Sequence, residues 1–252
     1  MKILSIGNSF SHDAHRYLHE IAKREGENVE TVNLFIGGCS LETHYNNLIK
    51  NLVVYDYEKN GGESSGKVSI SRALKEEKWD VVTLQQASHL SADIDTYFPY
   101  IVELAKYVRE NCPDAKIFVH QTWAYDNGSD RLKSVFYPSA DAMFADVRRS
   151  YDLAAKTIDA DGIIYSGETM LKALNCGINV DRDGFHAGFG AGRYLLGLVW
   201  YKTFTGNDIT GNGFNDFDEK VSDNDRQIII KAVKGVISSE KTRIRLYGLN
   251  AL

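Results

Sequence analysis

Residues 5–10, SIGNSF, lie where a short apolar run near the N-terminus meets a glycine, an amide and a hydroxyl. Residues 2–6 (KILSI) have the length and the aliphatic content of a buried strand. Gly7 and Asn8 are residue types that accept tight turns, and a serine often begins a helix. The segment therefore predicts a buried strand that turns sharply into a helix. Ser9 either caps that helix or stands at the end of the strand as a reactive group.

The same order of strand and helix repeats along the chain. Further strands are predicted at 29–38, 79–86, 115–123 and 161–167, and helices at 12–26, 41–52, 97–112, 139–159, 190–206 and 222–240. Alternating strands and helices pair in parallel through right-handed crossovers. We therefore predict a single α/β domain over residues 1–252, with a five-stranded, mostly parallel sheet between two layers of helices. Residues 53–69 interrupt the pattern and predict a hairpin or flap insert.

Composition narrows the function classes. The 252 residues are 43% hydrophobic and 25% charged, as in globular proteins, and the net charge of −5 argues against a nucleic-acid partner. The three cysteines form no CxxC pair, so neither a zinc site nor a disulfide framework is expected. No apolar stretch approaches the ~18 residues of a membrane span. We expect a cytoplasmic protein that does not bind membranes, unless a leader has been trimmed. Oligomeric state is not addressed by the sequence.

A serine hydroxyl becomes a good nucleophile when a histidine, oriented by a carboxylate, accepts its proton. His12, His15 and His19 fall on or beside the first predicted helix and are interpreted as surface residues. His186 differs, because Asp183 precedes it by three residues and one turn can present both side chains to the same point. Asp-x-x-His is a short pattern, so an N-capping aspartate beside an unrelated histidine is the alternative.

The segment DRDGFHAGFGAG, residues 181–192, also contains a Gly-x-Gly-x-Gly run that could bind phosphate. The run does not follow a predicted strand, however, and the turn GNSF lacks the later glycines of a dinucleotide-binding fingerprint. A nucleotide-binding Rossmann domain is therefore disfavoured.

The order of these features resembles the SGNH (GDSL-type) hydrolase superfamily of esterases and acetylhydrolases. The shared features are Gly-x-Ser after the first strand, glycine after the second, a polar cluster after the third and Asp-x-x-His near the C-terminus. The combination IGNSF, GGCSL, LQQAS and DGFHAG also resembles a bacterial branch of that superfamily of unknown function. The resemblance implies a flavodoxin-like α/β/α fold and catalysis without a metal or organic cofactor.

The resemblance also implies roles for individual residues. Ser9 matches the nucleophile, Asp183 the orienting acid and His186 the general base, with Asp181 as the alternative acid. The backbone N–H of Ser9 is expected in the oxyanion hole. Gly38 matches the glycine whose backbone N–H joins it there, and Gly37 is the alternative.

Two positions depart from the pattern of that superfamily. The usual third block, Gly-x-Asn-Asp, is replaced by LQQASH. Gln85 is therefore the candidate for the side-chain donor of the oxyanion hole, with Gln86 and His89 as alternatives. Asn8 stands where the usual block has aspartate, and we interpret it as a structural residue that orients the turn.

Two functions follow from these features. The first is a serine esterase that removes a small acyl group, with acetyl expected, from a carbohydrate or similar hydroxylated small molecule. The second is a non-catalytic glycan-binding module on the same fold, which would use aromatic residues such as Trp123 and Tyr125. The esterase requires Ser9 Oγ within hydrogen-bond reach of His186, and Asp183 at the other ring nitrogen.

Overall fold

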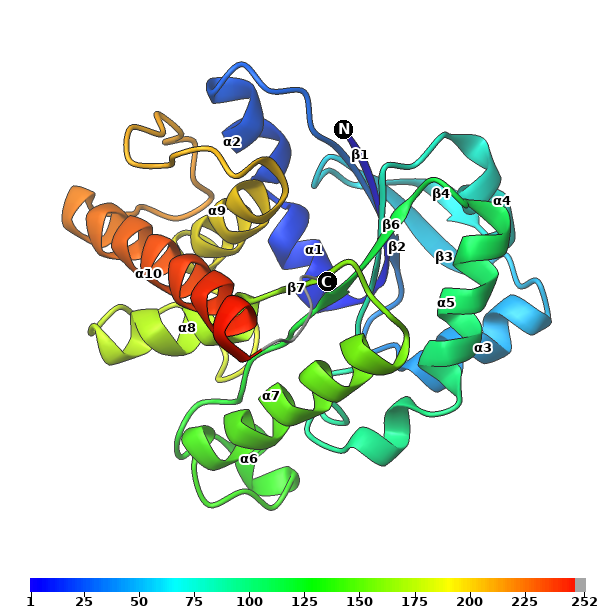
Figure 1. The fold of residues 1–252 in the computed structure, drawn as a ribbon. Coiled ribbons are helices and arrows are strands. Elements are labelled where there is room, and N and C mark those ends of the chain that lie inside the picture. Colours follow the sequence, from blue (N-terminus) through cyan, green and yellow to red (C-terminus); the bar gives the residue numbers. More distant parts are fainter. Residues whose placement is uncertain (248–252) are drawn as a thin grey trace.

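Seven strands form one sheet in the computed structural model, which describes the backbone of residues 1–247 and the side chains of residues 1–240 (Figure 1). The strands are β1 (Lys2–Gly7), β2 (Glu30–Phe35), β3 (Tyr55–Lys59), β4 (Ser64–Val68), β5 (Val81–Leu84), β6 (Lys116–His120) and β7 (Gly162–Ile164). Their order across the sheet is β4-β3-β2-β1-β5-β6-β7. The neighbours from β2 to β7 pair in parallel, which confirms the predicted parallel core. These five strands follow the 2-1-3-4-5 order of flavodoxin-like folds.

The predicted number of five strands is wrong, because the insert at 53–69 joins the sheet. Its two strands, β3 and β4, form an antiparallel hairpin that extends the sheet beyond β2. Asn60 and Gly61 take positive φ angles at the turn, as tight connections between antiparallel strands require. The carboxylate of Glu58 in β3 accepts a 2.8 Å hydrogen bond from the buried side-chain Nδ2 of Asn33 in β2. The hairpin therefore supplies a partner for a polar side chain that the sheet edge alone would leave unsatisfied.

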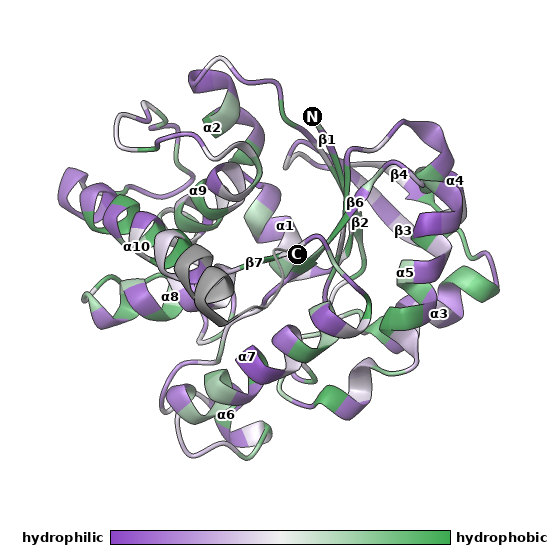
Figure 2. Ribbon diagram, in the orientation of Figure 1, coloured by the Kyte–Doolittle hydropathy of each residue, from purple (hydrophilic) through white to green (hydrophobic). Residues whose placement is uncertain are grey.

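Helices cover both faces of the sheet. They are α1 (Ser9–His15), α2 (Leu18–Arg24), α3 (Leu41–Ile49), α4 (Ile70–Glu76), a 3₁₀ helix η1 (Ile94–Tyr97), α5 (Tyr100–Asn111), α6 (Asp130–Ser134), α7 (Ala140–Thr157), α8 (Ser166–Asn175), α9 (Ala191–Thr205) and α10 (Asp223–Tyr247). Helices α1, α2, α8, α9 and α10 pack on one face, and α3, α4, α5 and α7 on the other (Figure 1). The hydropathy colouring shows polar and apolar residues interleaved along these helices (Figure 2). No helix in the described part of the chain is long and apolar enough to cross a membrane.

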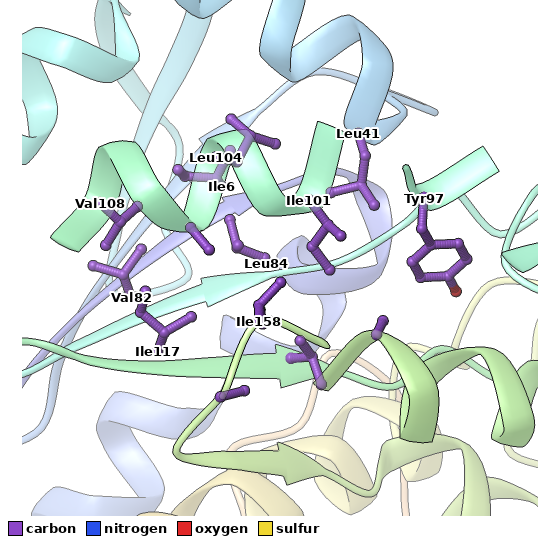
Figure 3. Packing of buried hydrophobic residues seen from close by; sticks show 14 of the residues in the cluster. Ile6, Leu41, Val82, Leu84, Tyr97, Ile101, Leu104, Val108, Ile117 and Ile158 are labelled. Carbon is purple, nitrogen blue, oxygen red and sulfur yellow. The ribbon is translucent and has the colours of Figure 1, made fainter. Parts of the chain in front are cut away.

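The buried core forms because successive strand residues point to opposite faces. In β1, Leu4 and Ile6 pack with the α3–α5 side, whereas Ile3 packs with the α1 and α9 side. The close-up shows Ile6 near Leu84 in the first of these clusters (Figure 3). With both faces covered, the crevice outside the carboxyl ends of the parallel strands is where such folds place a site.

Candidate active site

The turn after β1 leaves the Ser9 hydroxyl free of any capping role. Asn8 is the N-cap of α1, because its Oδ1 accepts a 3.0 Å hydrogen bond from the Phe10 amide. The Ser11 hydroxyl in turn accepts a 3.0 Å bond from the Asn8 amide. A methyl group on Gly7 would overlap that hydroxyl, which explains the glycine at this position. The capping interpretation of Ser9 is therefore wrong, and Ser9 is the first residue of the helix.

The imidazole ring of His186 lies between the Ser9 hydroxyl and the Asp183 carboxylate and contacts both. Ser9 Oγ is 3.0 Å from His186 Nε2, and His186 Nδ1 is 2.7 Å from Asp183 Oδ2. The other carboxylate oxygen of Asp183 accepts a 2.7 Å bond from the His186 amide. Burial opposes ionisation of Asp183, but its hydrogen bonds with the side chain and backbone of His186 hold its pKa below the usual value. An ionised Asp183 accepts from Nδ1–H, which leaves the Nε2 lone pair facing the serine hydroxyl.

Asp181, the alternative acid, does not contact the imidazole. Its Oδ1 accepts a 2.9 Å hydrogen bond from the Gly184 amide. Asp181 also approaches Asp126, and burial together with this neighbouring carboxyl raises the pKa of Asp126 to about 7. Asp181 therefore shapes the loop, whereas Asp183 orients His186.

A buried ion pair joins the helix of Ser9 to the loop of His186. Asp13, one turn along α1, is fully buried and accepts bonds from Arg182 at 3.0 Å and from Arg193 at 2.8 Å. The Arg182 amide also bonds to the His186 carbonyl at 3.1 Å. Sequence reasoning missed this clamp. The only signal was an aspartate within the first amphipathic helix, and its partners are distant in sequence.

The β2–α3 turn, which contains Gly38, is joined to Asn8 next to the nucleophile. Gly38 is exposed with φ +64°, a conformation that favours glycine. The side-chain Nδ2 of Asn8 donates a 3.1 Å bond to the carbonyl of the next residue, Cys39. Within residues 1–240, neither the Ser9 N–H nor the Gly38 N–H has a hydrogen-bond acceptor. Asn8 thus contacts the helix start and the β2–α3 turn at once, in agreement with its interpretation as an orienting residue.

Gln85 does not face the open crevice, contrary to our expectation for an oxyanion donor. It is 1% exposed, and its Nε2 donates a 2.6 Å bond to Asn8 Oδ1. Its Oε1 lies 2.8 Å from His120 Nδ1, and His120 Nε2 lies 3.0 Å from the Ser166 hydroxyl. Burial lowers the pKa of His120 to about 3, so its ring is neutral. Gln85 points away from the crevice because its side-chain amide forms hydrogen bonds with the buried Asn8 and His120.

The two alternatives to Gln85 have different environments. Gln86 is fully buried; its Oε1 accepts from the Leu41 amide at 3.0 Å, and its Nε2 donates to Thr96. His89 is exposed and lines an open hollow.

Two aromatic residues are packed away from the crevice, and one histidine differs from its predicted environment. Trp123 and Tyr125 are 3% and 2% exposed, so they are packed in the interior and present no ring face to a glycan. Trp123 stacks on Phe10 with ring centres 3.9 Å apart. His15, expected at the surface, is buried against Ser5 Oγ at 2.8 Å, and burial lowers its pKa to about 3.

One polar hollow adjoins the loop of His186, and a second shares Arg131 and Ser134 with the first. The first, of about 660 Å³, is lined by Asp126, Asn127, Ser129, Asp130, Arg131, Ser134, Asp183 and Gly184. The second, of about 830 Å³, is lined by His89, Leu90, Ala92, Asp93, Arg131, Ser134, Val135 and Tyr137. Arg131 belongs to both. The described residues contain no group of three or more histidine, cysteine or acidic side chains placed to hold a metal ion.

Comparisons with known proteins agree with this fold. The family model described as "Domain of unknown function (DUF4886)" matches residues 2–235. The chain is similar to the structure of a DUF4886 family protein from Bacteroides uniformis, with 34% identity, 94% of each chain covered and a TM-score of 0.88. No curated protein matches the sequence.

More distant structures have the same fold. A candidate SGNH hydrolase from Slackia heliotrinireducens has a TM-score of 0.58 at 23% identity, covering 81% of this chain and 98% of that one. A candidate GDSL-like lipase from Parabacteroides merdae has a TM-score of 0.56 at 16% identity, covering 81% and 95%. The chain therefore has an SGNH-like α/β fold with a seven-stranded, mostly parallel sheet.

Proposed function

The chain belongs to the DUF4886 family. From the hydrogen-bonded arrangement of the Ser9, His186 and Asp183 side chains, we propose that it is a serine ester hydrolase. The observation that carries the proposal is the pair of contacts at 3.0 and 2.7 Å that join hydroxyl, imidazole and carboxylate. Ser9 begins α1, whereas Asp183 and His186 lie in the loop between α8 and α9. The likeness to SGNH and GDSL-like hydrolases in fold supports the same class of reaction.

The reaction follows from the proton positions. His186 Nε2 accepts the Ser9 proton as Ser9 Oγ attacks the ester carbonyl carbon, and the carbonyl becomes a tetrahedral oxyanion. The alcohol leaves with the proton from His186, and an acyl group remains on Ser9. Water then attacks the acyl group with His186 as base, which releases the acid and restores the serine. Asp183 holds the ring orientation and stabilises the imidazolium in both steps.

The oxyanion is bound by backbone N–H groups of Ser9 and Gly38. Both lack an acceptor among the described residues, and the N-terminus of α1 adds a partial positive charge. Gln85 acts through Asn8 in this proposal: it holds Asn8, which in turn bonds to the Phe10 amide and the Cys39 carbonyl. The predicted direct contact between Gln85 and the oxyanion is thus replaced by a positioning role.

The proposed substrate is a small acyl ester, with acetyl expected, of a carbohydrate or similar hydroxylated molecule. The polar lining of the two hollows supports this class, because sugar hydroxyls need hydrogen-bond partners. The glycan-binding alternative has no observation in its favour, since Trp123 and Tyr125 are buried.

Hydrolysis of p-nitrophenyl acetate tests the proposal. We expect turnover by the unmodified protein and covalent labelling of Ser9 by a fluorophosphonate. Both signals should disappear in Ser9→Ala and in His186→Ala. Ser65→Ala, at an exposed serine in the β3–β4 hairpin, is the matched control and should retain both. Turnover that persists in Ser9→Ala, with labelling elsewhere, would refute the proposed nucleophile.

A further inference from the structure

We propose that Arg131 binds a carboxylate on the alcohol part of the substrate, so that the preferred esters are acylated hydroxy acids such as acylated acidic sugars. This inference rests on the proposed ester hydrolase function and names its substrate class. It is carried by the position of Arg131, by the absence of an ion-pair partner for it within the described residues, and by the hollow that it lines.

Arg131 lies beside the loop of the acid–base pair. Its guanidinium carbon is 4.3 Å from the centre of the Phe185 ring, and the Phe185 ring centre is 3.7 Å from that of His186. Stacking on an aromatic ring uses the face of a guanidinium. The N–H groups in its plane then remain available for a carboxylate, which they can bind in a bidentate manner.

The carboxylates near Arg131 have other partners. Asp130 is 2.8 Å from Lys133, and Asp183 is bonded to His186. Burial and the neighbouring Asp181 raise the pKa of Asp126 to about 7, so Asp126 is only partly charged at neutral pH. In the part of the chain with described side chains, no carboxylate lies within ion-pair distance of Arg131.

The 830 Å³ hollow is the more favourable of the two for an anion. It presents His89 and Arg131, with Asp93 as the one carboxylate in its lining. Asp93 accepts a 3.1 Å bond from the Asp95 amide at the start of η1. Burial, and after it the charge of Arg131, lower the pKa of His89, so the charge that this hollow offers to an anion comes from Arg131.

The other hollow is less suited to a carboxylate, because three aspartates line it beside Arg131. Arg131 forms part of the wall of both hollows. A substrate in the hollow with His89 could therefore place its carboxylate on Arg131 close to the loop that carries His186.

Pairs of esters that differ in charge test this inference. The first set is 3- and 4-acetoxybenzoate with the corresponding neutral acetoxybenzamides, and the second is O-acetylated galacturonate with O-acetylated galactose. We expect Arg131→Gln to raise KM for the anionic esters about tenfold or more and to leave the neutral ones within about twofold. Arg131→Lys should recover part of the loss, and added salt should weaken the preference of the unmodified protein.

Arg72→Gln, at an exposed arginine of α4 that lines neither hollow, is the matched control and should leave both classes unchanged. Equal effects of Arg131→Gln on charged and neutral esters, or no effect on either, would overturn the inference while the hydrolase function stands. No turnover of any ester by the unmodified protein would instead refute the proposed function, and this inference with it.

Discussion

Replacing Gln85 by alanine separates a positioning role from a direct catalytic one. The side chain is 1% exposed and bonds to Asn8 at 2.6 Å and to His120 at 2.8 Å. The substitution removes both bonds and leaves the His120 Nδ1–H buried without an acceptor. A lost buried hydrogen bond costs about 1 kcal/mol, and an unsatisfied buried donor about 1–3 kcal/mol. The free energy of unfolding should therefore fall by about 2–4 kcal/mol.

For a chain of this size, that loss corresponds to a decrease in Tm of about 4–16 °C. Thermal unfolding followed by circular dichroism measures it, and p-nitrophenyl acetate hydrolysis below the unfolding range measures kcat and KM separately. Because Gln85 holds Asn8, and Asn8 holds the turn before Cys39, kcat should fall while KM changes little. A direct oxyanion donor would also lower kcat, by about a hundredfold or more.

His120→Ala distinguishes the two roles. His120 contacts Gln85 and Ser166 behind the nucleophile turn. If Gln85 acts by positioning, His120→Ala should lower kcat as well, and the double variant should lose little more than Gln85→Ala alone. An unchanged Tm in Gln85→Ala, or a His120→Ala variant with full kcat, would refute the reasoning.

Three further substitutions follow from the same structure. Asp183→Asn keeps the shape of the site but favours the wrong ring tautomer of His186, so kcat should fall by about 10³-fold or more at neutral pH. Hydrolysis of p-nitrophenyl acetate measures this loss, and a loss below tenfold would contradict the role of Asp183 in orienting His186. Asp126 has a folded-state pKa of about 7, raised by burial and a neighbouring carboxyl, so the folded protein binds a proton more tightly and loses stability as pH rises from about 4 to 7. Asp126→Asn should therefore raise Tm more at pH 8 than at pH 5, and equal shifts at the two pH values would count against this assignment. Asp13→Ala leaves the buried Arg193 without one of its carboxylate partners and should lower the free energy of unfolding by about 3–5 kcal/mol, measured by urea titration; a shift under 1 kcal/mol would argue against the clamp.

Local sequence determined the parts of this protein that depend on short spacings. The turn at Gly7 and Asn8 follows from the residue types themselves, and Asp183 and His186 meet because three residues separate them in one loop. The alternation of strands and helices predicted the parallel core, because the spacing of apolar residues that indicates a strand or a helix can be recognised within a single segment. These features require no knowledge of what packs against them.

The tertiary structure alone decided where the remaining polar side chains point. From the sequence, the insert at 53–69 could be a flap or could extend the sheet. In the structure its strand β3 pairs with β2, and Glu58 in β3 accepts a hydrogen bond from the Asn33 side chain in β2. Gln85 is turned behind the nucleophile because Asn8 and His120, from other elements, need its amide. Asp13 is buried because Arg182, 169 residues away, neutralises it. A buried polar group takes the orientation in which distant partners satisfy it, and that choice exists only once the elements have packed.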